Sequence, residues 1–155
     1  MNFNYKSCEL FSSAICNLNC SYCYIPKLNC MGNIHREIIS KIESEEYFQD
    51  LKNLYGENLN SISLWGGEPS LILPTLGKKL NVLFEYFPKL YKIFFSTNFI
   101  TSEDLVIDFI KIFPKDKKRE LNIQISIDGD ESITDVNRAP GATEKIEKNI
   151  YKFIG

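Results

Sequence analysis

The sequence predicts an α/β fold in which parallel strands alternate with helices. Short runs rich in apolar residues alternate with segments that have helical spacing of apolar residues, which is the pattern of βαβ units. One of these runs, Leu121–Ile127, alternates apolar and polar residues at every position, so its two faces differ. Polar motifs follow successive strands at intervals of roughly 30 residues, as expected when one βα unit separates them.

The first expected unit runs from a strand at Ser7–Ala14 to a helix at Glu37–Tyr55. The helix is predicted from apolar residues spaced mostly three and four apart, and Gly56 follows as a typical terminating residue. Its apolar positions are Ile38, Ile42, Phe48, Leu51 and Tyr55. His35 precedes this helix, and we expect it on a solvated loop.

The second and third expected units follow the same pattern. The strand Ser61–Trp65 precedes a helix that ends at Pro88, because proline cannot continue a helix. The apolar positions of this helix are Leu76, Leu80, Leu83, Phe84 and Phe87. The strand Tyr91–Phe95 precedes a helix that Thr101 or Ser102 caps. The apolar positions of this third helix are Leu105, Phe109 and Ile112.

The fourth expected unit is the strand Leu121–Ile127, followed by a helix whose apolar positions are Ile146, Ile150 and Phe153. The apolar side of a parallel strand meets the covering helices, so the polar side of this one faces a ligand or, at a sheet edge, solvent. That polar side carries Asn122, Gln124 and Ser126. Closed eight-stranded barrels fill their interior with branched apolar side chains, so a polar interior favours an open or wider barrel with the binding site inside.

Length and composition exclude several classes of protein. The chain has 155 residues, of which 44% are hydrophobic and 25% charged, as in a single globular domain rather than a disordered or coiled-coil chain. A net charge of −2 gives no basic excess for nucleic acid. There is no apolar stretch of the roughly 18 residues that a membrane helix needs, and no secretory signal pattern at the start. We therefore expect a cytoplasmic protein with no nucleic-acid or membrane partner.

The five cysteines indicate a metal site rather than a disulfide framework. They are Cys8, Cys16, Cys20, Cys23 and Cys30, an odd number concentrated near the start of the chain. The spacing C-x3-C-x2-C within this set allows three thiolates on one short loop to hold three irons of a cubane cluster, which leaves the fourth iron open. A structural zinc site with Cys8 or Cys30 as the fourth ligand and a C-x2-C redox pair are the alternatives.

Polar motifs follow the second, third and fourth strands. The first is Trp65-Gly66-Gly67-Glu68-Pro69, in which glycines permit close approach of a ligand and a carboxylate can hold an amine. The second is Ser96-Thr97-Asn98, and the third is Ser126-Ile127-Asp128-Gly129 with Asp135 and Arg138 beyond it. A guanidinium suits a carboxylate ligand. The carboxyl ends of parallel strands are where such folds bind ligands, so we expect these motifs to meet there.

With Tyr22 directly before its last cysteine, the cysteine motif resembles the C-x3-C-x-aromatic-C signature of the radical S-adenosylmethionine (radical SAM) superfamily. The resemblance extends from about Lys6 to Phe153. It implies a partial (β/α)6 TIM-like barrel, of which about four βα units are expected here. We therefore expect residues 1–155 to be the N-terminal part of such a core domain, truncated after the fourth unit.

The resemblance also implies a role for each motif. Cys16, Cys20 and Cys23 would hold a 4Fe–4S cluster. The remaining expected site residues would bind S-adenosylmethionine. The glycine motif would bind its amine, and the other motifs would contact its ribose, its carboxylate or the substrate. These residues are Tyr22, Gly66, Gly67, Glu68, Thr97, Asn98, Ser126, Asp128 and Arg138.

The implied activity is reductive cleavage of S-adenosylmethionine to methionine and a 5′-deoxyadenosyl radical, which takes hydrogen from a substrate. The last motif is similar to S-x-D-G…H-D-x-x-R of the peptide-modifying and sulfatase-maturase branch, although Thr134 replaces the histidine. The resemblance therefore implies an oxygen-sensitive maturase with a peptide or protein substrate and an electron donor of the flavodoxin or ferredoxin type. No cysteine follows Cys30, so no auxiliary-cluster domain is expected. The alternatives are an inactive or partner-dependent fragment, with a second chain completing the barrel, and a zinc-binding structural domain.

Overall fold

A computed structural model describes residues 6–25, 28–100 and 103–154 of the chain. The strands are β1 (Ser7–Ser13), β2 (Ser61–Gly66), β3 (Lys92–Thr97) and β4 (Glu120–Ile125). The helices are α1 (Met31–Glu43), α2 (Glu46–Tyr55), α3 (Leu73–Lys78), α4 (Leu80–Tyr86), α5 (Glu103–Ile112), α6 (Glu131–Asn137) and α7 (Ala142–Ile154). Two short 3-10 helices, η1 (Gly56–Asn58) and η2 (Pro69–Ile72), lie in the connections.

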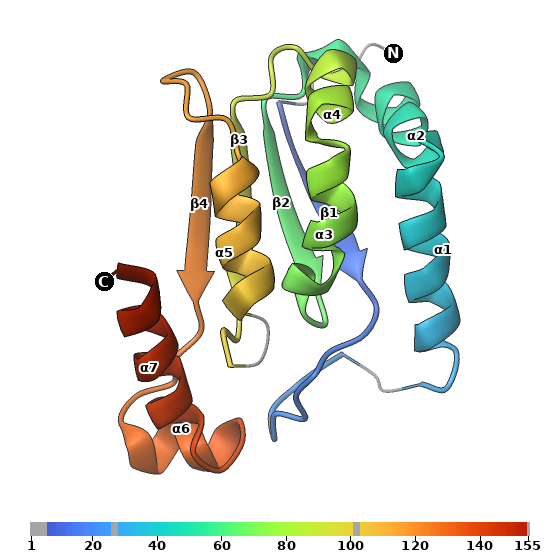
Figure 1. The fold of residues 1–155 in the computed structure, drawn as a ribbon. Coiled ribbons are helices and arrows are strands. Elements are labelled where there is room, and N and C mark those ends of the chain that lie inside the picture. The colour runs from blue at the N-terminus through green and yellow to red at the C-terminus, as the bar shows by residue number, and fades with distance from the viewer. Residues whose placement is uncertain (1–5, 26–27, 101–102, 155) are drawn as a thin grey trace.

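The four strands form one parallel sheet in the order β1-β2-β3-β4, so each strand pairs with the next one in the chain. Helices follow every strand, and α1 to α5 cover one face of the sheet (Figure 1). This arrangement confirms the predicted α/β fold with four βα units of a partial TIM-like barrel. The carboxyl ends of the strands, α6 and the loop after β1 lie at the same end of the molecule (Figure 1).

The hydrophobic core lies between the sheet and the helices that cover it. Alternate residues of the central strands are buried, among them Ile62, Leu64, Ile93 and Phe95. On β4, the residues Leu121, Ile123 and Ile125 pack against this core, which confirms the predicted split of that strand. Ile127 lies beyond β4 and is 49% exposed, so its predicted place on the apolar face is wrong.

Several predicted helix boundaries are wrong for local reasons. The segment 37–55 is broken at Glu45, whose φ of 67° ends α1 and starts α2 in a new direction. The segment 76–87 is divided between α3 and α4 at Lys79. His35 lies inside α1 and is half-buried rather than on a loop, since α1 starts six residues before the predicted helix, at Met31.

The predicted face of the third helix is displaced by one position. In α5 the buried residues are Val106 and Phe109, whereas Ile112 is 56% exposed and Phe113 takes its place in the core. The two expected caps, Thr101 and Ser102, lie outside the described residues. The fourth helix, α7, buries Ile146 as expected, but leaves Phe153 46% exposed.

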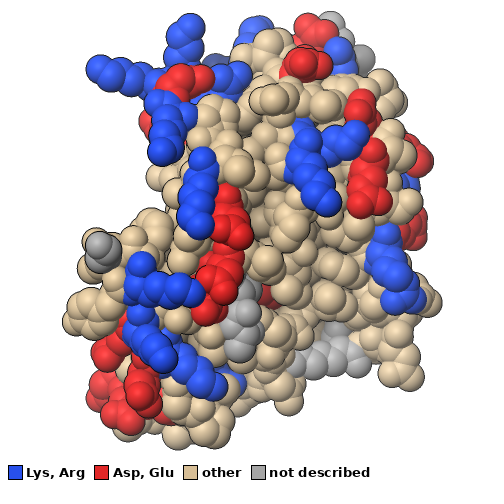
Figure 2. Space-filling view, in the orientation of Figure 1, with Lys and Arg blue, Asp and Glu red and all other residues tan. Residues whose placement is uncertain are grey.

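Charged side chains are mixed on the face shown in Figure 2, where Lys and Arg lie beside Asp and Glu. Ion pairs lie at the surface of the molecule; Lys152 and Asp104 form one at 2.7 Å, and Lys111 and Asp108 form another at 2.9 Å. Exposed pairs of this kind contribute little to stability. In the part of the chain that the structure describes, no helix is long and apolar enough to cross a membrane.

Candidate functional site

The carboxyl ends of the strands open onto a cavity of about 310 Å³. Of the twelve residues that the sequence assigns to the site, every one except Asp128 lines this cavity. They arrive from the loop after β1, from the ends of β2 and β3, and from the segments after β4. Parallel strands place these distant motifs side by side, because all of their carboxyl ends lie at one edge of the sheet.

The cysteine loop, which we define as residues 14–25 after β1, carries seven of the lining residues, and three of them are cysteines. Cys16 and Cys20 are half-buried, and Cys23 is exposed. The backbone N–H of Leu18 donates to Cys16 Sγ at 3.4 Å. Burial raises the pKa of Cys20, and the positive charge of Arg138 opposes that rise. Among the described residues, no three His, Cys, Asp or Glu side chains already converge as a metal site, so the three sulfurs surround the cavity without meeting at one point.

The other two cysteines lie away from this cavity. Cys8 is in β1 and only 7% exposed, and burial raises the pKa of its thiol to about 12. Such a thiol stays protonated and behaves as a small apolar side chain. Cys30 is exposed and directly precedes α1. Neither residue lines the cavity, so the structure gives the three remaining cysteines no fourth cysteine partner there.

Gly66 and Gly67 are required by the packing of backbone on backbone. A Cβ at Gly66 would lie 2.2 Å from the carbonyl oxygen of Ser13, and one at Gly67 would lie 2.2 Å from that of Ile15. The N–H groups of Gly67 and Glu68 donate to these same two oxygens, each at 2.8 Å. We expected these glycines to permit close approach of a ligand. The structure shows that they permit close approach of the backbone at Ser13 and Ile15, where the cysteine loop begins.

Glu68 is buried, with 2% of its surface exposed, and its carboxylate is held by three donors. The N–H of Ser70 donates to Oε1 at 3.2 Å. The backbone N–H and the side-chain amide of Asn98 donate to Oε2 at 2.9 and 2.6 Å. The same Asn98 amide donates to Asn17 Oδ1 in the cysteine loop at 2.7 Å. Glu68 and Asn98 therefore connect the ends of β2 and β3 to the cysteine loop.

The turn after β3 is strained and is held by a residue that the sequence did not single out. Phe99 has a φ of 53° and is 2% exposed. Asn149 of α7 donates to the carbonyl oxygens of Phe99 and Ile100 at 2.9 and 3.3 Å. The available signal was a polar residue at helical spacing in the buried stripe of α7, after Ala142 and Ile146.

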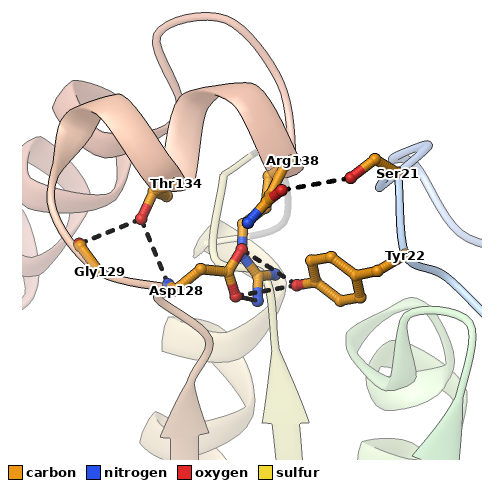
Figure 3. A network of polar contacts seen from close by, with 7 residues as sticks. Ser21, Tyr22, Asp128, Gly129, Thr134 and Arg138 are labelled. Carbon is orange, nitrogen blue, oxygen red and sulfur yellow. Dashed lines mark hydrogen bonds and ion pairs between the residues drawn. The ribbon is translucent and has the colours of Figure 1, made fainter.

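Asp128 and Arg138 form an ion pair that reaches the cysteine loop (Figure 3). Arg138 Nη2 donates to Asp128 Oδ1 at 2.7 Å, and the hydroxyl of Tyr22 donates to the same carboxylate at 2.9 and 3.1 Å. Partial burial and this hydrogen bond raise the pKa of Tyr22 to about 12, so the hydroxyl stays a donor. Burial lowers the pKa of Arg138, but the hydrogen bond and charge of Asp128, together with Tyr22 and Cys20, raise it overall, so the guanidinium stays charged.

Asp135, which belongs to the same motif as Arg138, has a structural role. Its carboxylate accepts from the N–H groups of Gly141 and Thr143 at 2.6 and 2.8 Å and from the Thr143 hydroxyl at 2.8 Å. These bonds lower its pKa and satisfy donors at the start of α7. Asp135 does not line the cavity.

Replacing Asn98 with alanine is expected to lower the free energy of unfolding by about 3 kcal/mol, since the buried Glu68 carboxylate loses its side-chain amide donor at 2.6 Å and keeps only two backbone donors. The backbone donor can remain only if the turn keeps its shape. Urea unfolding of the variant measures the loss, and Asn53→Ala on the exposed side of α2 is the matched control. Asn98→Asp gives a second check: two facing carboxylates should make the variant more stable as the pH falls. A loss as small as that of the control would contradict the role of Asn98.

His35 is expected to make the chain less stable in weak acid. Burial lowers its pKa from the ordinary 6.5, and its Nδ1 lies 3.4 Å from Ser13 Oγ. The unfolded chain then binds a proton more readily, so stability is lost as the pH falls from 6.5 toward the folded pKa. His35→Gln should show a smaller loss in urea unfolding between about pH 7.5 and about pH 5.5. An equal loss in both proteins would assign the pH dependence to other groups.

Comparison with models of known protein families shows the family of the chain. The protein-family model described as "Radical SAM superfamily" matches residues 10–154, which is nearly the whole chain and includes every candidate site residue. No curated protein matches the chain.

Proposed function

The chain belongs to the radical SAM superfamily, and from this premise we propose that Cys16, Cys20 and Cys23 hold its 4Fe–4S cluster. Enzymes of this superfamily use such a cluster together with S-adenosylmethionine. When bound, the two groups supply a one-electron cleavage that yields methionine and a 5′-deoxyadenosyl radical, which takes a hydrogen atom from a substrate. The observation that carries the proposal is the single cavity bordered by the three thiols and the motifs after β2, β3 and β4.

The cysteine set fits a cluster better than structural zinc. Three thiolates leave one iron of a cubane without a protein ligand, whereas a structural zinc site closes with four. Cys8 is buried in β1 and Cys30 lies outside the cavity, so a fourth cysteine is lacking there. The Leu18 N–H that donates to Cys16 Sγ would stabilise a thiolate, as hydrogen bonds to ligand sulfur do in iron–sulfur proteins.

We infer that Glu68 and Arg138 orient the methionine end of S-adenosylmethionine. A carboxylate has about four acceptor positions, so Glu68 keeps capacity for an amine beyond its three bonds within the chain. The Arg138 side chain is 10% exposed, and its buried Nε has no acceptor among the described residues, which suits a carboxylate ligand. Ser126, Thr97 and Asn98 line the same cavity and are proposed to contact the ribose or the substrate.

We further propose that the substrate is a peptide or protein. The support is the segment from Ser126 to Arg138, which is similar to that of the peptide-modifying and sulfatase-maturase branch. Enzymes of the superfamily generally receive electrons from flavodoxin or ferredoxin, and we propose a low-potential donor of this type.

The origin of the abstracted hydrogen tests this proposal. The chain is reconstituted anaerobically with iron and sulfide, reduced with dithionite, and given S-adenosylmethionine with a pool of peptides deuterated at carbon. We expect 5′-deoxyadenosine that carries deuterium with the peptide pool but not with a deuterated pool of small metabolites. Label from the metabolites alone would contradict a peptide substrate. A complete cluster without any 5′-deoxyadenosine would support the alternative of a partner-dependent fragment.

We also propose that a second chain adds a strand beside β4. The outer edge of β4 pairs with no strand in the described part of the chain, and free strand edges readily accept further strands. Sedimentation at increasing concentration measures this association. A chain that remains monomeric at all concentrations would contradict pairing between two copies. The second chain would then have to be a protein of different sequence.

A further inference from the structure

The stretch between Cys20 and Cys23 is hydrogen-bonded to the C-terminal end of α6. The backbone N–H of Ser21 donates to the carbonyl oxygen of Asn137 at 2.8 Å, and the Ser21 hydroxyl donates to Asn137 Oδ1 at 3.3 Å. The hydroxyl of the next residue, Tyr22, reaches Asp128. These bonds join residues more than a hundred positions apart and lie directly between two of the three cysteines.

Asp128 is the centre of this contact, because it binds both partners with one carboxylate (Figure 3). Tyr22 donates to both of its oxygens, and Arg138 donates to Oδ1. The guanidinium carbon of Arg138 lies 5.9 Å from the centre of the Tyr22 ring, so the three side chains close on one another. The side chains of Asp128 and Arg138 are 17% and 10% exposed, and solvent therefore screens the pair less than a surface pair.

Thr134 of α6, which is completely buried, holds the backbone that carries Asp128 and Arg138. Its hydroxyl accepts from the N–H of Asp128 at 3.2 Å and donates to the carbonyl oxygen of Gly129 at 3.1 Å. Its own carbonyl oxygen accepts from the N–H of Arg138 at 2.9 Å. One residue of α6 thus fixes the backbone of both members of the ion pair.

We propose that Tyr22, Asp128 and Arg138 form a clasp that holds the Cys20–Cys23 stretch of the loop against α6, and that Tyr22 and Asp128 are positioning residues for the cysteines. The clasp complements the bond between Asn17 and Asn98, which holds the loop on the other side of Cys20. Its significance for the cluster rests on the proposed function, but its effect on the loop does not.

Hydrogen exchange in the chain without iron tests the clasp by itself. Tyr22→Phe removes one hydroxyl and keeps the aromatic ring. We expect amide exchange in residues 20–23 to become about tenfold faster, because a hydrogen bond to a charged group is lost. Tyr24→Phe is the matched control on the same loop, since its ring is 80% exposed, and it should exchange like the wild type. Unchanged exchange in Tyr22→Phe would overturn the proposal.

A double-mutant cycle separates the clasp from a general loss of structure. Asp128→Asn should speed exchange in the same residues, and adding Tyr22→Phe should then have little further effect, because both changes break the same contact. Strictly additive effects, or exchange that is faster throughout the sheet, would contradict a local clasp. Circular dichroism shows whether each variant is folded.

The cluster supplies a second, independent measurement. In reconstituted chain, Tyr22→Phe should lose iron to a chelator several-fold faster than Tyr24→Phe and should broaden the electron paramagnetic resonance signal of the reduced cluster. Identical iron loss and spectra in the two variants would contradict a positioning role. If the wild type takes up no cluster, the proposed function fails, while the exchange measurement still decides whether the clasp exists.

Discussion

Replacing Cys20 with alanine is expected to abolish binding of the iron–sulfur cluster. The three thiols that border the cavity are the whole cysteine complement of that site, so the loss of one leaves two ligands for four irons. After anaerobic reconstitution, the variant should lack the absorbance near roughly 400 nm that iron–thiolate clusters show. It should also retain almost no iron. We expect the same result for Cys16→Ala and Cys23→Ala.

Cys8→Ala and Cys30→Ala are the matched controls for this loss. Neither residue lines the cavity, so both variants should bind as much iron as the wild type. Iron binding that depends on Cys30 as much as on Cys20 would contradict the three-cysteine site. Zinc retained by the wild type, with no band in the visible range, would favour a structural zinc domain.

Replacing Gly67 with alanine is expected to disrupt both the fold at the end of β2 and cluster binding. The new Cβ would lie 2.2 Å from the carbonyl oxygen of Ile15, 2.5 Å from its carbon and 3.1 Å from the backbone nitrogen of Cys16. Backbone atoms cannot rotate away as a side chain could, so the stem of the cysteine loop must move. We expect the free energy of unfolding to fall by about 3 kcal/mol or more and iron binding to be lost.

Gly56→Ala separates this clash from the cost of a positive φ alone. Gly56 has a φ of 66°, but nothing lies within 4 Å of the position that its Cβ would take. With its ψ of −163° this backbone is nearly restricted to glycine, so its substitution should cost about 1–3 kcal/mol but leave iron binding intact. Urea unfolding and iron analysis of the two variants measure the difference. A Gly67→Ala variant as stable as Gly56→Ala, with a full cluster, would contradict the close packing described here.

The sequence predicted which segments meet at the cavity better than it predicted the helix boundaries. Motifs such as Gly66–Glu68 and Ser96–Asn98 follow strands, and the parallel sheet alone is enough to bring strand ends together. Periodicity could not predict the break at Glu45, because a positive φ at a residue other than glycine has no signal in the spacing of apolar residues. At the end of α5, Phe113 is buried instead of Ile112, because tertiary contacts select which of two neighbouring apolar residues faces the core.

The purposes of individual residues were harder to predict than their positions. Glu68 was expected to hold a ligand amine. In the structure its carboxylate accepts hydrogen bonds from Asn98 and Ser70. Asn149 holds the strained turn at Phe99 from a helix fifty positions away; the spacing in α7 could indicate that Asn149 is buried, but not which residue it contacts. Thr134 fixes Asp128 and Arg138 through its hydroxyl and its carbonyl oxygen. Such roles depend on contacts between distant segments, which one sequence does not reveal.

The most direct test is whether the chain cleaves S-adenosylmethionine through the cluster of Cys16, Cys20 and Cys23. Reconstituted wild-type chain with dithionite should release 5′-deoxyadenosine and methionine in equal amounts. Cys30→Ala should release as much as the wild type, and Cys20→Ala should release none. A wild-type chain that carries its full cluster but releases no more product than Cys20→Ala would contradict catalysis by this chain.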